Sequence, residues 1–313
     1  MARARDPDRE LFLKRTAAAL QLPAAAVEER LSRRLRSSLR VNPLRASDPA
    51  ATLAGLASSD LVFEPIPWAR DCYHLHGDKA AVVAAPAHAA GEVFLQNASS
   101  FIPAVALAPE AGHRVLDVCA APGGKASHLA ALVQNALELH VNDALRSDKL
   151  ADVLELLGVK VAALTAHPGQ YVDKFVAGPF DRILLDAQCG GEGMLDLRHP
   201  GAMRYWSMAR IRKYHHLQRS MLQAAWKLLS PGGVLVYSTC TFAPEENEAV
   251  VSALLKHRED AVVEPIPAAP PDRRPSVLSW EGERFHHALR EAVRLAPSEF
   301  FEGFFVCRLR KLA

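Results

Sequence analysis

The sequence lacks the features of a secreted or membrane-embedded protein. Its opening residues, 1–10, carry too many charges for a secretory signal, and no apolar run approaches the roughly 18 residues that a membrane span requires. The five cysteines are an odd number, widely scattered, and none forms a Cys-x-x-Cys pair. We therefore expect free thiols, no disulfide framework, no metal site and a cytoplasmic location.

Low-complexity tracts and internal repeats are also missing. Half of the residues are apolar (50%) and 23% are charged, which is typical of a folded globular protein. A chain of 313 residues is long enough for two domains of ordinary size.

The net charge of +2 is small but unevenly distributed. Residues 1–45 contain eleven Arg and Lys against five acids. This excess indicates an anionic partner, and the alternative is a solvated helical face. If the charges bind a polyanion, binding should weaken steeply with salt.

The first part of the chain has a mixed pattern. Residues 8–20 and 24–36 have helical periodicity, whereas "SLRVNPLRA" and "LVFEPIPWARDCYHLH" indicate short strands interrupted by prolines. We expect a small α+β N-terminal module over residues 1–90, followed by a helical stretch near 95–107.

From residue 112 onward, strand-like and helix-like segments alternate. Strands separated by helical crossovers form a mostly parallel sheet covered on both faces, so residues 91–313 are predicted to form a Rossmann-like α/β domain. A final strand at 304–311 would suit an antiparallel edge. The expected parallel strands span residues 114–119, 137–143, 159–165, 180–187 and 232–240. Ligands of such sheets bind beyond the carboxyl ends of the strands.

A glycine-rich turn follows the first of these strands in "VLDVCAAPGGKASHLA". Its spacing matches neither Gly-x-Gly-x-x-Gly nor a P-loop, which weakens a dinucleotide or triphosphate assignment. Asp143 ends the second strand about 20 residues later, where an acid can hold ribose hydroxyls. An adenosine cofactor without phosphates fits, and S-adenosylmethionine is the leading candidate.

Two further strands end near cysteines, in "LLDAQCGGEGML" and "YSTCTFAPEENE". A single such cysteine is usually inert packing, but two thiols and Asp186 at one sheet edge favour chemistry. The C5 carbon of a pyrimidine needs a thiolate at C6 before it can accept a methyl group, and an acid at the ring nitrogen would stabilise the developing charge. At product release the C5 proton must be removed and the first thiol expelled, and a second thiol or a water could assist there.

These stretches together resemble the motifs of RsmB/RsmF-like (Sun-family) RNA cytosine-5 methyltransferases, in that family's chain order. The resemblance covers roughly residues 38–311 and is carried by "SLRVNPLR", "LQNASS", "DVCAAPGGK", "LLDAQCGGEG", "YSTCTFAPEENE" and "EGFFVCRLRK". It implies an enzyme that transfers a methyl group from S-adenosylmethionine to C5 of a cytosine in rRNA or tRNA.

The resemblance also implies roles for individual residues. Cys240 would be the nucleophile, Cys189 would assist product release, and Asp186 would contact the target base. The cofactor would be held by Cys119, Ala120, Ala121, Pro122, Gly123, Gly124, Lys125, Asp143 and Asp186. Arg40, Asn42 and Arg45 would lie on the RNA side.

The chain departs from the family pattern at three positions. Gln188 and Gly190 replace the usual Pro and Ser around Cys189, and His167 stands where an acid usually contacts the adenine. A neutral imidazole can still hydrogen-bond an adenine edge, so we include His167 among the cofactor contacts. Two alternatives remain open: a catalytically weak or inactive RNA-binding relative that retains cofactor binding, and a methyltransferase acting on DNA or protein.

A basic and aromatic stretch, "MRYWSMARIRKYHHLQR", follows the Cys189 loop at 203–219. Basic side chains suit phosphates and aromatic rings suit unstacked bases, so Arg204 and Arg210 are predicted RNA contacts. The alternative is a helix with core aromatics and solvated charges. The target base should be single-stranded or flipped. The sequence does not decide the oligomeric state, although we favour a monomer.

Overall fold

The computed structural model describes residues 7–267 and 270–313. Arg3 and Arg5, which contribute to the N-terminal excess of positive charge, lie outside the described residues. Within the described part, no helix is both long enough and apolar enough to cross a membrane.

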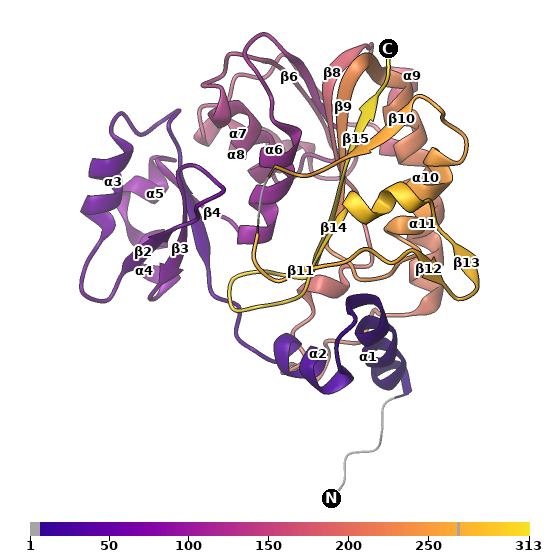
Figure 1. Ribbon diagram of the computed structural model, residues 1–313. Helices are drawn as coiled ribbons and strands as arrows, with labels where there is room; N and C mark the ends of the chain where they lie inside the picture. Colours follow the sequence, from indigo (N-terminus) through magenta and orange to yellow (C-terminus); the bar gives the residue numbers. More distant parts are fainter. Residues whose placement is uncertain (1–6, 268–269) are drawn as a thin grey trace, which may run out of the picture.

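A four-stranded antiparallel sheet forms the first structural unit, in the order β2-β3-β1-β4 (Figure 1). The strands are β1 (Ser38–Val41), β2 (Val62–Pro65), β3 (Cys72–His76) and β4 (Val93–Leu95), and the helices beside them are α3 (Pro49–Leu56), α4 (Lys79–Ala84) and α5 (Pro86–Ala89). The side chains of Asp48 and Asp78 accept from backbone amides at the starts of α3 and α4, as N-caps do. The two proline-interrupted strand predictions are confirmed, and β4 extends this sheet past residue 90.

Helices α1 (Pro7–Leu20) and α2 (Ala24–Leu31) do not pack on this sheet. Phe12 meets Trp206 edge to face with ring centroids 5.7 Å apart, in an apolar cluster that also contains Leu31 and Phe242. The N-terminal helices therefore belong spatially to the second domain (Figure 1). Helix α2 ends at Leu31, so the prediction of a helix to residue 36 was wrong. Residues 33–36 cross between the two units instead, and the backbone amide of Arg36 donates to the carbonyl of Glu299 (2.8 Å).

The second unit is built on a nine-stranded sheet whose five parallel strands follow the predicted alternation. They are β5 (Arg114–Asp117), β6 (Glu138–Asn142), β7 (Ala163–Thr165), β8 (Phe180–Asp186) and β9 (Leu229–Thr239), in the spatial order β9-β8-β5-β6-β7. The order reverses between β5 and β8, which is where α/β sheets of this kind bind ligands. The predicted Rossmann-like fold is confirmed.

Strand β15 (Phe304–Lys311) runs antiparallel to β9, as expected, but it is not an edge strand. Its outer side pairs with β14 (Val293–Leu295) and β10 (Ala261–Glu264), and β11 (Arg273–Arg274) pairs with β14. A separate hairpin is formed by β12 (Ser279–Trp280) and β13 (Glu283–Arg284). The edge assignment was wrong because these short strands continue the sheet.

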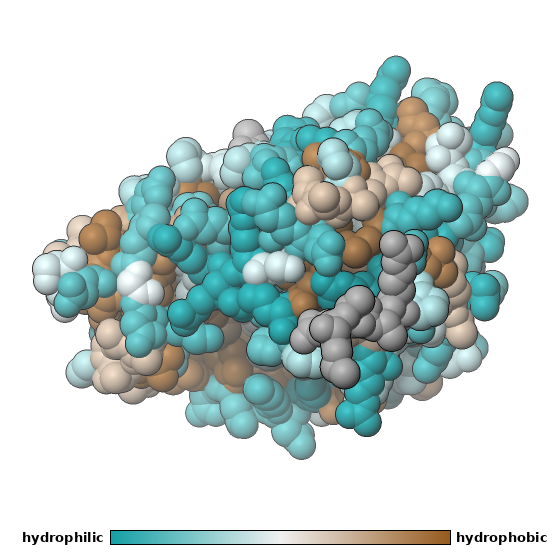
Figure 2. All heavy atoms as spheres, turned by 90° about the horizontal axis from the view of Figure 1, so that it is seen from below, coloured by the Kyte–Doolittle hydropathy of each residue, from teal (hydrophilic) through white to brown (hydrophobic). Residues whose placement is uncertain are grey.

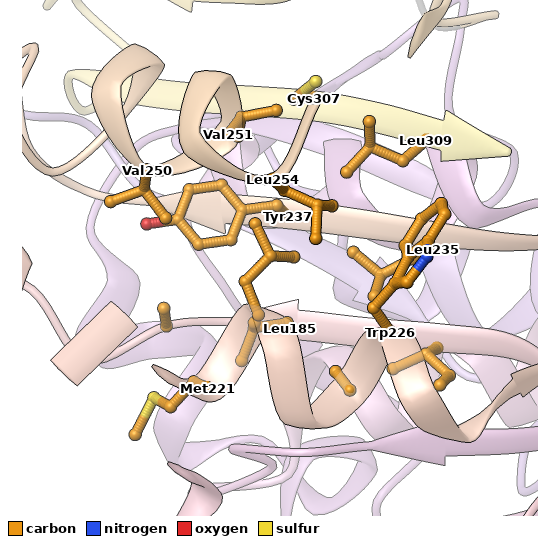
Figure 3. Close-up of a cluster of buried hydrophobic side chains, with 14 of the residues drawn as sticks. Leu185, Met221, Trp226, Leu235, Tyr237, Val250, Val251, Leu254, Cys307 and Leu309 are labelled. Carbon is orange, nitrogen blue, oxygen red and sulfur yellow. The ribbon is translucent and has the colours of Figure 1, made fainter. Parts of the chain in front are cut away.

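Helices cover both faces of the large sheet (Figure 1). Helices α6 (Ile102–Leu107), α7 (Gly124–Leu132) and α8 (Ser147–Leu156) lie on one face, and α9 (Val172–Phe175), α10 (Met208–Leu228) and α11 (Glu248–Leu255) lie on the other. The single turns η1 (Ala98–Phe101), η2 (Gly169–Tyr171), η3 (Glu192–Met194) and η4 (His287–Glu291) occur in the connections. Figure 3 shows Tyr237 and Leu235 of β9 packed between Leu185, Trp226 of α10 and Val250 of α11. This rigid core fixes the strand ends that carry the site.

Candidate functional site

The candidate site lies where β8 and β9 end side by side. These strands are parallel, and Asp186 is in register with Ser238. The Ser238 hydroxyl donates to Asp186 Oδ1 at 2.7 Å. The loops that follow the two strands therefore start from adjacent points, which brings Cys189 and Cys240 together.

The sulfur atoms of these two cysteines are 3.3 Å apart, and both residues are half-buried free thiols. The hydrogen bond with Cys240, together with burial, raises the pKa of the Cys189 thiol well above its ordinary value. Cys189 is therefore a neutral S–H at physiological pH and can donate to the Cys240 sulfur. Convergence of the two thiols was predicted from the strand-end positions.

Lys125 and Asp186 form an ion pair beside the thiols, with Nζ 2.6 Å from Oδ2. Burial lowers the pKa of the Lys125 ammonium, but the charge and hydrogen bond of Asp186, together with the nearby Cys240 and Asp117, make the net shift upward. The pair supplies a positive donor and a carboxylate that the protein holds in a fixed orientation. Lys125 was predicted only as a cofactor contact, so its pairing with Asp186 is an addition.

The glycine-rich turn borders a cavity of about 160 Å³ that reaches Lys125 and Asp186. The cavity is lined by Cys119, Ala120, Ala121, Pro122, Gly124, Lys125 and Asp186, and also by Phe94, Leu95, Gln96 and Ser100. Gly123 has φ +110, which side-chain-bearing residues rarely adopt, and a Cβ on Gly124 would lie 3.2 Å from the Phe94 ring. This turn therefore needs glycine at both positions to keep the cavity and the start of α7 open.

Asp143 braces the same turn from the end of β6. Its Oδ2 accepts from the amide of Ala121 at 3.1 Å, and its Oδ1 accepts from the amides of Leu145 and Arg146. The neighbouring Asn142 side chain bonds the backbone of both Val118 and His167. Asp143 thus contacts the glycine-rich turn, and Oδ2 keeps a lone pair for a ligand hydroxyl. Its predicted contact with the cofactor stays a prediction.

His167 lies at the end of β7, but its ring stacks on Phe175 at a centroid distance of 4.1 Å. Its backbone amide and carbonyl are both bonded to Asn142. The imidazole is therefore packed against a side chain of the protein. The predicted contact of His167 with a cofactor stays a prediction.

Two of the predicted RNA contacts are not available at the surface. Arg40 is only 1% exposed and donates to the hydroxyl of Ser127 in α7, while Asn42 is 0% exposed and donates to the carbonyls of Gly91 and Leu157. Burial also lowers the pKa of Arg40 to about 10. The prediction that Arg40 and Asn42 lie on the RNA side was wrong, because they join the four-stranded sheet to the large domain.

Arg45 also makes interdomain contacts. Its guanidinium donates to the carbonyls of Glu155 and Leu156 at the end of α8. A cation at a helix C-terminus stabilises the last carbonyls of the helix. Because it makes these two hydrogen bonds, the guanidinium of Arg45 is largely engaged.

Arg204 and Arg210 lie near the site but differ in setting. The exposed Arg204 stacks over Tyr205, and the partly buried Arg210 lies over Tyr214 on α10. Trp206 is buried, and its indole N–H donates to Glu192 at 2.7 Å. The 203–219 stretch is therefore partly core and partly surface, and RNA contact by the two arginines stays a prediction.

Sequence reasoning missed three buried polar residues around the thiols: Glu192, Gln218 and Glu246. Glu192 accepts from the Thr241 hydroxyl and the Phe242 amide, directly after Cys240. Glu246 lies in the loop before α11, which begins at Glu248. Within the described residues, no group of three or more His, Cys, Asp or Glu side chains could hold a metal ion.

Comparison with known proteins identifies the family of this chain. Residues 104–310 match the family model of the 16S rRNA methyltransferase RsmB/F, and residues 9–98 match the N-terminal domain of 16S rRNA methyltransferase RsmF. The chain belongs to the RsmB/F methyltransferase family. The resemblance inferred from the motifs is confirmed.

Two relatives illustrate the range of this family. The tRNA (cytosine(49)-C(5))-methyltransferase of Pyrococcus abyssi is 34% identical over 281 residues, which cover 88% of each chain. The ribosomal RNA small subunit methyltransferase F of Serratia proteamaculans is 39% identical over 286 residues, but these cover 89% of this chain and 58% of the relative.

A solved structure of a methyltransferase homolog from Pyrococcus horikoshii superimposes with a TM-score of 0.84. It is 30% identical and covers 98% of this chain and 100% of its own. The fold of the family is therefore present over the whole described chain.

Proposed function

We propose that this protein transfers a methyl group from S-adenosylmethionine to C5 of a cytosine in RNA, through a covalent bond between Cys240 and C6. The observation that carries the proposal is the 3.3 Å separation of the Cys189 and Cys240 sulfurs beside the Lys125–Asp186 ion pair. Relatives named as rRNA and tRNA cytosine-C5 methyltransferases support RNA as the substrate.

The residues around the glycine-rich turn fit S-adenosylmethionine. The start of α7 has no side-chain cap among the described residues, and the Asp143 carboxylate is fixed against the loop. Residues 119–125 and Asp143 would hold the cofactor, which supplies an electrophilic methyl group when bound. The cavity opens onto Lys125 and Asp186, so the donor and the target base would meet at that pair.

Cys240 starts the reaction. Its thiolate forms a bond to C6 of the cytosine, and the electron pair of the C5–C6 double bond moves into the ring, which makes C5 nucleophilic. Lys125 and Asp186 hold one acidic proton between them. They can share it with the ring nitrogen of the cytosine, where negative charge develops. After methylation, C5 carries both a hydrogen and the new methyl group.

Product release removes that hydrogen and breaks the C6–S bond. The neutral Cys189 thiol can donate its proton to the departing Cys240 sulfur, and the resulting Cys189 thiolate can accept the C5 proton. Cys189 thus regains from C5 a proton in place of the one that it gave to Cys240. Both residues take part in turnover, but only Cys240 forms the adduct. The raised pKa of Cys189 keeps this thiol protonated until product release and makes its thiolate a good base for the C5 proton.

Labelled methyl transfer tests the proposal. Purified protein is incubated with methyl-labelled S-adenosylmethionine and separate rRNA and tRNA fractions, and 5-methylcytosine is identified after digestion. Cys240→Ala should abolish incorporation, whereas Cys307→Ala, which removes a buried thiol on β15, should retain it. Cofactor binding by the wild type without transfer to RNA would instead indicate a non-catalytic relative, and label on DNA or protein would indicate a different substrate.

A further inference from the structure

Two connected grooves flank residues 33–36, which we call the arginine segment. The outer groove has a volume of about 930 Å³ and lies between the arginine segment and the turn that starts α4. The inner groove, of about 320 Å³, shares Arg33 and Arg34 and is lined at its other end by Gly193 and Glu302. Hydrophilic side chains cover most of the middle of the surface on the side of α1 and α2 (Figure 2).

The positive charges of the outer groove are only partly neutralised. Arg33 pairs with Glu29, and Arg36 pairs with Glu299 at 2.6 Å. Arg34 and Lys79 are exposed, and neither has an ion-pair or hydrogen-bond partner for its side chain among residues 7–267 and 270–313. Two cations therefore remain available to an anionic ligand.

One end of the inner groove lies next to the loop that contains Cys240. The amide of Gly193 donates to the carbonyl of Cys240 at 2.9 Å, so this wall of the groove is one hydrogen bond from the catalytic strand end. Glu302 lies close enough to Lys125 and Asp186 for both charges to influence its pKa, which burial raises to about 7. A nucleic-acid strand that follows the two grooves would run from the surface cations towards the thiols.

We propose that the two grooves bind the single-stranded RNA segment next to the target cytosine, with Arg34 and Lys79 contacting its phosphates. This inference rests on the proposed function and names where its substrate lies. Single-stranded RNA is favoured over an acidic peptide because the inner groove ends at Gly193, which is hydrogen-bonded to Cys240, and a base must be unpaired to be attacked at C5 and C6.

The test compares Arg34→Gln/Lys79→Gln with Lys160→Gln/Arg290→Gln, which removes two exposed cations outside the grooves. Binding of a single-stranded RNA oligonucleotide is measured by anisotropy over a range of salt concentrations. Each lost phosphate contact lowers the salt slope by about 0.7, so the groove variant should lose about 1.4 and bind roughly 10-fold more weakly at moderate salt. Methyl transfer at subsaturating RNA should fall in the same proportion as the affinity.

Equal affinity and slope for the two double variants would overturn the inference, as would a loss of binding seen with poly-glutamate and not with RNA. Failure of the proposed function is distinct, because the wild type would then show no methyl transfer at all.

A second inference comes from hydrogen bonds that hold the Cys189 loop. The carbonyl of Gln188 accepts from Gln218 Nε2 at 2.8 Å, and the amide of Gly190 donates to Glu246 Oε2 at 2.8 Å. Gln218 also donates to that oxygen at 2.9 Å, which links the two contacts. Both peptide groups that flank Cys189 are therefore fixed by two side chains that are fully buried.

The Gly190 departure from the family pattern fits this arrangement. A Cβ at Gly190 would lie 2.6 Å from Glu246 Oε1, so the close approach of this carboxyl group requires glycine or a shift of the side chain. The carbonyl of Glu246 accepts from the buried Tyr237 hydroxyl at 2.6 Å, which fixes the backbone of the residue. The loop has Gln188 where the family usually has proline. Hydrogen bonds to neighbouring side chains thus hold it, rather than the rigid ring of a proline.

We infer that Glu246 and Gln218 are positioning residues that hold the Cys189 thiol at Cys240 and so control release of the methylated product. The inference rests on the proposed function. Burial, together with the nearby Glu192, raises the pKa of Glu246 to about 8, so the protonated side chain at neutral pH resembles glutamine.

The experiment measures the fraction of enzyme trapped as a covalent RNA adduct, by denaturing gel, during turnover on saturating RNA. Glu246→Ala should accumulate adduct at least about 10-fold above wild type although both cysteines are present, and Glu246→Gln should return most of the wild-type behaviour. Gln218→Met gives an independent perturbation if Glu246→Ala does not fold. Glu248→Ala removes another buried carboxylate, one that pairs with Arg294, and should destabilise the protein without trapping RNA.

Reduced methylation without adduct in both Glu246→Ala and Gln218→Met, as in Glu248→Ala, would overturn this inference. If Cys189→Ala itself trapped no RNA, the proposed function and not the positioning role would be wrong.

Discussion

The sulfur of Cys189 lies 3.3 Å from the sulfur of Cys240, although the two residues are 51 positions apart in the chain. The parallel register of β8 and β9 creates this contact, because Asp186 and Ser238 are direct neighbours. Two strand ends of one sheet therefore deliver both thiols to the same point. Lys125 at the start of α7 and Asp186 at the end of β8 form the ion pair that completes the group.

Asp186→Asn should lower kcat by about 100-fold or more, because the variant leaves the Lys125 ammonium without its counter-charge and removes a fixed carboxylate from the site. It should also lower the free energy of unfolding by about 1–3 kcal/mol. Steady-state methyl transfer and urea denaturation measure the two effects. Asp181→Asn is the matched control at the opposite end of β8, where the carboxylate accepts from the Arg114 amide. Equal kcat values for the two variants would contradict the assigned role.

Gly193→Ala should impair both folding and activity. The added Cβ would lie 2.0 Å from the carbonyl oxygen of Gly303, so the loop after Cys189 must move away from β15. Overpacking of this kind costs about 1–3 kcal/mol, and the shift should also displace Cys240, whose carbonyl accepts from the Gly193 amide. Thermal denaturation and methyl transfer are the measurements. Gly201→Ala, with no atom within 4 Å of the added Cβ, should behave as wild type, and an equally small effect at Gly193 would refute the packing argument.

Arg294→Met should destabilise the protein by about 3–5 kcal/mol, because it leaves the buried Glu248 carboxylate unpaired. The two side chains are 1% and 0% exposed, so solvent cannot replace the lost partner. Arg294→Met/Glu248→Leu removes both charges and should recover much of that loss in urea denaturation. A double variant that is less stable than Arg294→Met would show that the charge pair is not the main contribution.

Stability should fall as pH rises from about 5 to 8, in part because of Glu246. Its pKa is about 8 in the folded protein against an ordinary value near 4.5, so the folded state binds more protons throughout this interval. Below pH 4.5 both states are protonated and the group contributes nothing, whereas by neutral pH the penalty is on the order of 3 kcal/mol. Glu246→Gln should flatten the profile of unfolding free energy against pH. Parallel wild-type and variant profiles would mean that the carboxyl group does not titrate as described.

The mostly parallel sheet and the meeting of the two cysteines could be predicted because both follow from alternating strand and helix patterns. The outer strands β10, β11 and β14 are only two to four residues long and lie among prolines and turns, so no periodicity marks them. This is why β15 was wrongly placed at an edge.

Burial of polar residues was the main feature that the sequence did not reveal. All four residues of β1 are buried, so its alternation has no solvent side and Arg40 points at Ser127. Likewise, Glu246 and Gln218 are common surface types whose role depends on contacts between α10 and the loop before α11. Such pairings join distant segments and have no local signature.

The central claim is that Cys240 bonds to the cytosine and Cys189 completes its release. The most direct measurement is a denaturing gel of protein incubated with labelled RNA and S-adenosylmethionine. Cys189→Ala should run as a stable RNA adduct that contains Cys240 bonded to methylated cytosine, while Cys189→Ala/Cys240→Ala should show none. An adduct that persists in the double variant, or full methyl transfer by Cys240→Ala, would contradict the account.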